Sequence, residues 1–453
     1  MRKSILLLLC AIGCAMMIQA AQSGAVKGVY YVSAAGSARA DGRTPETPKK
    51  DLQAVLNLIK ERNENGAIIR VAEGNYLGSL DAGYIEVSNW VTLEGGYNAD
   101  FSKSNPRKYI TRIEPTEAQR ATNARKGLIT LSGLDDAVGN KPTGKLVITG
   151  FTFNHGYENY YLPADPSDPK NGCPSNAFET GRMVDAPSQL EHPCIKSEQA
   201  VAGDVLISNC IFLNSPYFAI QINSRRGNIV IANNIFVSNR YGAVRVDGWD
   251  KNGTASSVEF HHNVVAFSWC RDKTMEDMGY GYECMTRVNC TIHHNIFACN
   301  NYAAIARTHV LSGPDKVIES KRTTNIVNNA FFMNPADLLL PAPGGGGWTR
   351  VKAAQFEEVE EQILPVASGN FELEANSPFV NAIDQDYLKA FASLKIVRSA
   401  TFDANSAANT FRETFGLNKT GSETTRVSMY GNRYPLDKAI LLFGAIKTYG
   451  PQL

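Results

Sequence analysis

The chain has 453 residues, and its 45 Lys or Arg side chains balance 44 Asp or Glu side chains to leave a formal net charge of +1. Nucleic-acid binding usually requires a basic surface, so this balance argues against a nucleic-acid partner. The length is ample for a large hydrophobic core, and beyond the N-terminal segment no apolar run is long enough to span a bilayer.

The N-terminal segment begins with Met1-Arg2-Lys3, runs apolar to about Ile18 and reaches small residues at Ala20. A basic head followed by a short apolar run and small residues is typical of a secretory signal peptide, which we expect at 1–20. An uncleaved membrane anchor is the alternative. The residues before Cys14 are similar to a lipoprotein processing site, so we expect membrane attachment only if Cys14 is lipidated.

The next segment, 21–66, predicts a strand followed by a helix. Residues 29–33 are a β-type run, and residues 51–60 show helical periodicity with Asp51 as a suitable N-cap. The apolar positions of that helix fall on one face: Leu52, Val55, Leu56 and Ile59. A stack of β coils exposes apolar side chains and strand edges at its open end, so we expect this helix to cap the first coil.

Three later stretches share one register, in which a Tyr follows six residues after the Ile of an Ile-Phe pair. They begin at Ile211, Ile235 and Ile296, the first two lie 24 residues apart, and a degenerate copy begins at Val264. A unit of this length, rich in short β-type runs and separated by Asn, predicts the coils of a solenoid.

Alignment on the Ile-Phe pair places like residues in columns. One apolar column contains Ile207, Ile231, Phe260, Ile292 and Ile326. A second contains Asn209, Asn233, His262, His294 and Asn328, and a third contains Cys210, Asn234, Asn263, Asn295 and Asn329. Asn tolerates left-handed backbone angles, and its amide can bond its counterpart one coil away, so we expect these columns at a tight corner. For His262 and His294, packing in the column is expected rather than metal binding.

The coil pattern of Ile207–Phe212, Ile231–Phe236 and Ile292–Phe297 resembles that of exported bacterial proteins with the right-handed parallel β-helix of the pectate-lyase-like superfamily. Tyr30–Ser33 is similar to the N-terminal entry of such proteins, and Asn376–Ala382 is similar to their closing coil. The resemblance implies an all-β fold with a parallel β-helix at 67–385 and a closing region at 386–453. It also implies a protein that is secreted, periplasmic or on the outer surface of a bacterium.

Two coils are interrupted by long insertions, at about 155–199 and 270–287. Both leave just beyond the Phe column, so we expect them to flank one groove, and long loops on a rigid scaffold often bind ligands. The alternative is that they only cover the sheet. The residues expected to contact a sugar chain are Tyr160, Tyr161, Arg225, Trp249, Arg271 and Tyr282.

The strand after the Tyr column carries the candidate chemistry. β-Elimination from a uronate requires a neutralised carboxylate, a base and an acid. The candidate catalytic residues are Arg245, Lys251, Arg307 and His309, and the candidate calcium ligands are Asp247 and Asp250, because calcium prefers oxygen ligands. In the alternative interpretation they are solvated surface pairs that contribute under about 1 kcal/mol each.

We therefore predict an exported carbohydrate-active protein, most simply a lyase acting on an acidic polysaccharide, with calcium as a candidate cofactor. One alternative is a non-catalytic cell-surface or glycan-binding solenoid. A second is a glycoside hydrolase, which needs a pair of carboxyl groups. Asp272, Glu276, Asp277 and Glu283 are available for that role. The implied superfamily contains all three kinds of protein, so fold alone does not choose among them.

Overall fold

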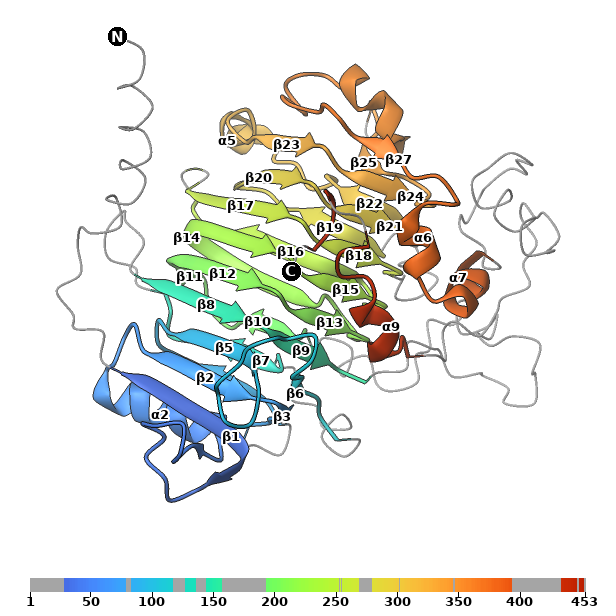
Figure 1. Ribbon diagram of the computed structural model, residues 1–453. Coiled ribbons are helices and arrows are strands. Elements are labelled where there is room, and N and C mark those ends of the chain that lie inside the picture. Colours follow the sequence, from blue (N-terminus) through green and yellow to red (C-terminus); the bar gives the residue numbers. More distant parts are fainter. Residues whose placement is uncertain are drawn as a thin grey trace, which may run out of the picture.

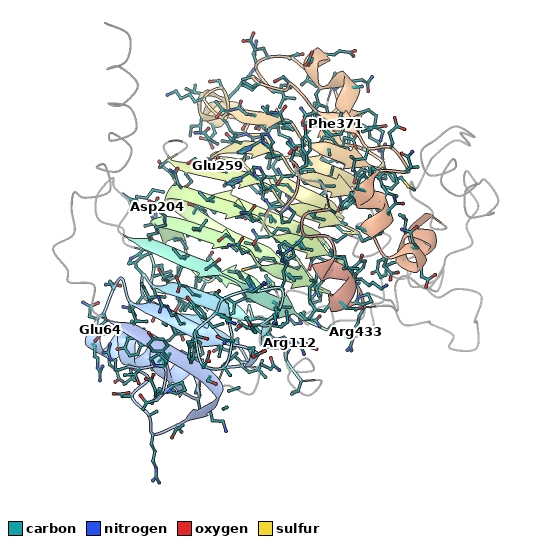
Figure 2. All side chains as sticks on the ribbon, in the orientation of Figure 1. Glu64, Arg112, Asp204, Glu259, Phe371 and Arg433 are labelled. Carbon is teal, nitrogen blue, oxygen red and sulfur yellow. The ribbon has the colours of Figure 1, made fainter. Side chains whose placement is uncertain are left out.

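The computed structural model describes residues 28–78, 83–116, 127–135, 144–156, 193–251, 253, 255–268, 279–300, 302–344, 347–392, 433–445 and 448–451. The signal sequence and Cys14 lie outside these ranges. The described chain winds into parallel coils that stack from the blue end to the orange end of Figure 1. Glu64 lies near the first end and Phe371 near the other (Figure 2). None of the helices in these ranges is long and apolar enough to cross a membrane.

Each complete coil adds one strand to each of three sheets, which we call A, B and C. Sheet A contains β1 (Val29–Ser37), β2 (Ile68–Ala72), β5 (Thr92–Tyr97), β8 (Lys145–Thr149), β12 (Asp204–Ser208), β17 (Ser256–His261), β20 (Val288–His293) and β23 (Thr324–Val327). Sheet B contains β3 (Gly74–Asn75), β6 (Thr111–Ile113), β9 (Phe151–Asn154), β13 (Ile211–Leu213), β15 (Ile235–Val237), β18 (Val264–Ala266), β21 (Ile296–Ala298), β24 (Ala330–Phe332) and β27 (Phe371–Glu372).

Sheet C contains β4 (Ile85–Val87), β7 (Ile129–Leu131), β10 (Ile195–Ser197), β11 (Val201–Ala202), β16 (Gly242–Gly248), β19 (Tyr280–Cys284), β22 (Ala303–Ala306), β25 (Leu338–Pro341) and β26 (Trp348–Val351). The long strand β14 (Ile220–Ala232) passes through sheets C and A. The strand pairs are parallel except β25 with β26, which is antiparallel. β10 and β19 lie within the ranges expected to be insertions, so these residues belong to the coils and the predicted insertion ranges are too long. Residues 157–192 and 269–278 lie outside the described residues.

The predicted apolar column is confirmed. Ile207, Ile231, Phe260, Ile292 and Ile326 are successive register partners in sheet A. All five are fully buried. In sheet B the rings of Phe153, Phe212 and Phe236 stack face to face, with centroids 4.9 and 4.7 Å apart. Large side chains from neighbouring coils therefore fill the interior in layers.

Helix α2 (Leu52–Arg62) packs against β1 and β4. Its four expected apolar residues are buried. The Asp51 carboxylate caps the helix by accepting from the backbone N–H groups of Gln53 and Ala54, at 2.8 and 3.3 Å. The remaining helices are short: α5 (Lys316–Glu319), α6 (Pro378–Ala382), α7 (Gln385–Ala392), α9 (Leu436–Ile440) and the 3₁₀ turns η2 (Gly313–Asp315) and η3 (Ala353–Glu358).

The closing of the stack differs from the expectation. The interior ends at a segment within 351–364, where fully buried Phe356 packs edge-on against the Phe331 ring at 5.5 Å. The described part of 386–453 instead packs on the outer face of sheet B, together with α6 (Figure 1). Strands of sheet B such as β13 and β15 carry apolar side chains on both faces. The outer face of the sheet therefore needs an apolar cover, which the C-terminal segments provide.

The two columns rich in Asn have different roles at the corner between sheets A and B. The first takes the left-handed backbone conformation, with φ of 54° at Asn209, 57° at Asn233, 52° at His262, 54° at His294 and 53° at Asn328. The second forms an amide ladder. The Oδ1 of Asn263 accepts from the backbone N–H and the Nδ2 of Asn234, at 2.9 and 3.1 Å. Asn263, Asn295, Asn329 and Asn370 repeat this pattern in order.

A second amide ladder, not predicted from the sequence, lies between sheets B and C. The backbone N–H of Ser268 donates to Asn300, and the backbone N–H and Nδ2 of Asn300 donate to Asn334 at 3.1 and 3.0 Å. The preceding corner positions again have positive φ, at 58° for Phe267 and 54° for Cys299. Phe and Cys are not typical of the left-handed conformation. The corner between sheets B and C therefore had a weaker sequence signature than the Asn-rich corner between sheets A and B.

Removing one rung of the first ladder should destabilise the fold. Asn263→Ala deprives the buried backbone N–H and Nδ2 of Asn234 of their acceptor, at a cost of about 1–3 kcal/mol for each group. The measurement is the free energy of unfolding in urea. Thr291→Ala on the outer face of β20 is the matched control, and an equal loss in both variants would contradict a ladder role.

Four imidazoles stack at the first corner, and we call His261, His262, His293 and His294 the histidine array. His261 lies on His293 with centroids 4.9 Å apart, and His262 lies on His294 at 5.1 Å, with nearly parallel planes. Burial first, and then the neighbouring imidazoles, lower the pKa of His262 to about 4 and also lower the pKa of His261 and His294. Glu259 opposes this shift at His261, and the Tyr449 ring stacks on His294.

The array predicts a loss of stability in acid. A histidine pKa that is lower in the folded than in the unfolded chain stabilises the fold above about pH 6.5, and this contribution is lost as the pH falls toward about 4. Urea unfolding midpoints at about pH 7.5 and about pH 5 test it. His262→Asn should reduce the difference between them, because Asn already occupies this corner at Asn233 and Asn328. An unchanged difference would rule out the array as its source.

Candidate functional site

The outer face of sheet C brings charged residues of two neighbouring coils together. Arg245 of β16 and Glu283 of β19 are register partners, so their side chains leave the sheet side by side, about 4.8 Å apart at the backbone. Asp247 lies two residues along β16 on the same face, and His309 follows the end of β22. We call Arg245, Asp247, Glu283 and His309 the Glu283 cluster.

The Arg245 guanidinium lies between two carboxylates. Its Nε and Nη2 donate to the two oxygens of Asp247 at 2.9 and 3.2 Å, and its Nη1 is 3.4 Å from Oε2 of Glu283. Burial lowers the pKa of Arg245, but its hydrogen bonds to Asp247 and the charge of Glu283 outweigh this effect, and the net pKa is raised. The guanidinium is thus a fixed cation between two carboxylates.

Glu283 holds the cluster together. Its side chain is only 1% exposed, and its Oε1 lies 2.9 Å from Nε2 of His309, whose side chain is 44% exposed. Its Oε2 forms an ion pair with Arg245, and within the described residues it accepts no hydrogen bond. The buried carboxylate therefore orients an imidazole whose other edge faces solvent.

Arg322, which is 2% exposed, ties together the two segments that carry this pair. Its Nη1 donates to the backbone oxygens of Met285 and His309, at 3.1 and 2.9 Å. Its Nε lies 3.5 Å from Oε1 of Glu319. The backbone after Glu283 and the backbone at His309 are therefore held at one guanidinium. Sequence reasoning missed Arg322, because no repeat or motif marks it.

The prediction for Arg307 is corrected by its contacts. The side chain is buried, and its Nε and Nη2 donate to Thr324 and Glu319 at 3.3 and 3.1 Å, away from Arg245. Ala306 is the register partner of Glu283, whereas Ile305 is the partner of inward-facing Tyr282, so alternation places Arg307 on the face opposite to the Glu283 cluster.

Tyr282 is also corrected. It pairs with Val244 and Ile305 in an inward-facing column and is fully buried, so its ring is part of the core and cannot meet a sugar. Tyr282 belongs to β19 and not to the loop predicted from the sequence. Glu283, next to it, was considered only as one of several loop carboxylates. Tyr160, Tyr161 and Arg271 lie outside the described residues.

The other predicted residues lie along the edge of sheet C beyond β16. Trp249 is 50% exposed, and its contact with a sugar stays a prediction. Arg225 pairs with Asp135 through two bonds of 2.7 and 2.8 Å, and it also interacts with the charge of Asp250. Lys251 is exposed, and its backbone oxygen accepts from Arg287 at 3.1 Å.

Calcium binding at Asp247 and Asp250 stays a prediction. Both oxygens of Asp247 already accept from Arg245, and nowhere in the described ranges do three or more His, Cys, Asp or Glu side chains meet with metal-binding geometry. A cation at Asp247 would therefore need solvent, a substrate oxygen or a rearranged Arg245 to complete its ligand set.

Aromatic rings border the cluster. The rings of Tyr217 and Tyr241 lie 4.6 Å apart, as expected for the Tyr column, and Phe218 lies 6.0 Å from the Arg245 guanidinium. Tyr217 is half-buried and interacts electrostatically with Arg245. The arrangement combines a fixed cation, a carboxylate–imidazole pair and a phenol, which together can position an anion and transfer protons.

The electrostatic balance of the cluster can be tested by stability. Arg245→Met should lower the free energy of unfolding by about 3 kcal/mol, because it leaves the buried Glu283 without its counter-charge. Adding Glu283→Gln to that variant should restore part of the loss. Arg225→Met, whose Asp135 partner stays partly exposed, is the control and should cost under about 1 kcal/mol. Simple additivity of the two cluster substitutions would contradict the coupling.

Comparison with known proteins agrees with the architecture. A family model described as a right-handed beta helix region matches residues 195–347. No significant match was found among curated proteins or among solved structures. The matched range includes the coils that form the Glu283 cluster. The family model and the paired parallel coils together identify the chain as a parallel β-helix protein.

Proposed function

We propose that the chain is an exported carbohydrate-active enzyme of the pectate-lyase-like type, which cleaves an acidic polysaccharide by β-elimination at the Glu283 cluster. The observation that carries the proposal is the His309–Glu283 pair. A buried carboxylate hydrogen-bonded to one nitrogen of an imidazole fixes the orientation of the ring. The exposed edge of His309 is then suited to take the proton beside a uronate carboxylate.

Arg245 supplies the charge that this reaction needs. An arginine has five N–H groups, and the hydrogen bonds to Asp247 engage two of them. The remaining N–H groups can meet the substrate carboxylate and stabilise the negative charge that develops when the proton leaves. Tyr217 is the candidate donor of a proton to the leaving oxygen, and Trp249 offers a flat surface for a sugar ring.

The contacts of the two acids favour elimination over hydrolysis. A glycoside hydrolase needs one carboxyl group that can give a proton to the leaving oxygen. Asp247 and Glu283 both pair with the Arg245 guanidinium, so neither is placed as a free carboxyl group for that role. The cluster contains two acidic side chains and one arginine, so a divalent cation should assist the binding of an acidic polymer. Calcium is retained as the candidate cofactor for that reason.

The test is incubation of the purified chain with a panel of uronate polysaccharides, with and without calcium. The expected result is absorbance from the unsaturated sugar that elimination creates. His309→Asn should reduce kcat by at least about 100-fold, the contribution typical of a positioned base. Trp249→Ala should mainly raise KM, and Thr291→Ala is the folding-matched control.

Other outcomes would replace the proposal. New reducing ends without the unsaturated product would indicate a glycoside hydrolase. Glycan binding without turnover, retained when Arg245, Asp247 and His309 are all replaced by Ala, would indicate a non-catalytic surface protein. Absence of any product with every polymer, with and without calcium, would contradict an enzyme of this class.

A further inference from the structure

The histidine array has a feature that packing alone does not require. Within each coil the two Nδ1 atoms face each other: His261 and His262 are 2.9 Å apart at these atoms, and so are His293 and His294. Two nitrogen atoms at this distance share a proton when no other ligand is present. The same distance also suits two adjacent ligands of one metal ion.

Glu259 distinguishes the second pair from the first. Its Oε1 lies 3.1 Å from Nε2 of His293, and the side chain is exposed on the outer face of β17, where Figure 2 labels it. A carboxylate at Nε2 favours the tautomer that carries its proton there, which leaves a lone pair on Nδ1. Histidine ligands of metals usually have such a carboxylate or carbonyl partner on the other nitrogen.

We propose that His293 and His294 chelate a divalent transition-metal ion through their Nδ1 atoms, with Glu259 as the outer partner of His293. With metal–nitrogen bonds of about 2.0–2.1 Å, a separation of 2.9 Å gives an angle near 90° at the metal. That angle suits the tetragonal geometry of Cu²⁺ or Ni²⁺ better than tetrahedral Zn²⁺, and Cu²⁺ generally binds nitrogen ligands more tightly than Ni²⁺.

The surroundings are compatible with this role. His294 is held in place by the stacked ring of His262 on one side and by the ring of Tyr449 on the other. Because the described ranges contain no group of three or more His, Cys, Asp or Glu side chains with metal-binding geometry, the protein supplies two ligands and solvent completes the set. The array lies at the corner between sheets A and B, whereas the Glu283 cluster lies on sheet C, so the proposal is independent of the catalytic one.

The test is a titration of the full chain, without a polyhistidine tag, with CuCl₂ at neutral pH. Binding is followed by calorimetry and by the nitrogen couplings in the electron paramagnetic resonance spectrum. We expect one tight site with coupling to two imidazoles. His293→Asn and His294→Asn should each weaken it at least tenfold and remove one coupled nitrogen, and Glu259→Gln should weaken it about tenfold.

The controls separate this site from adventitious binding. His309→Asn removes a histidine elsewhere and should leave the affinity unchanged, as should His261→Asn one coil away. His294→Asn should fold, because Asn233 and Asn328 occupy the same corner position, and a thermal melt checks this. Equal losses in all four histidine variants, or no loss in the variants of His293 and His294, would overturn the proposal.

Discussion

The hydrogen bonds of the Asn ladder fix the register on which the rest of the structure depends. Each amide oxygen accepts two hydrogen bonds from its partner in the preceding coil, as Asn295 does from Asn263, and each Nδ2 also donates to a backbone oxygen, as Asn263 does to Ile231 at 2.9 Å. A slip of one residue would turn apolar side chains outward and break this network. The ladder at one corner therefore controls which side chains reach the surface on the opposite sheet, including Arg245 and Glu283.

Repetition explains what could be predicted. The column from Ile207 to Ile326 and the left-handed corner at Asn233 were evident because every coil repeats the same constraint. Glu283 was assigned to a loop because Tyr280–Cys284 lacks the Ile-Phe register, and only its pairing with β16 reveals a strand. The inward orientation of Arg307 depends on the register of β22 against β19, and the cover on sheet B depends on chain segments far away in sequence, so neither had a local signature.

The Glu283 cluster shows how a buried charge is tolerated on this scaffold. A carboxylate that is 1% exposed would be costly alone, yet Arg245 and His309 approach it from adjacent strands while Arg322 fixes the backbone around it. The contacts that stabilise the buried charge in the folded chain also limit the reactions that the cluster can support. Arg245 is held by Asp247 and Glu283, so only its N–H groups outside these contacts can meet a substrate, together with the exposed imidazole of His309.

Both proposed sites arise from the same geometric rule, with different side chains. Stacked coils place equivalent positions about 5 Å apart, so unlike partners such as Arg245 and Glu283 form an ion pair, whereas like partners such as His262 and His294 form a parallel stack. Like charges at that distance would repel, and together with burial this lowers the pKa of His262. A metal ion held between two nitrogens of one coil would occupy the position of the shared proton, so acid and metal should act on this corner in opposite directions.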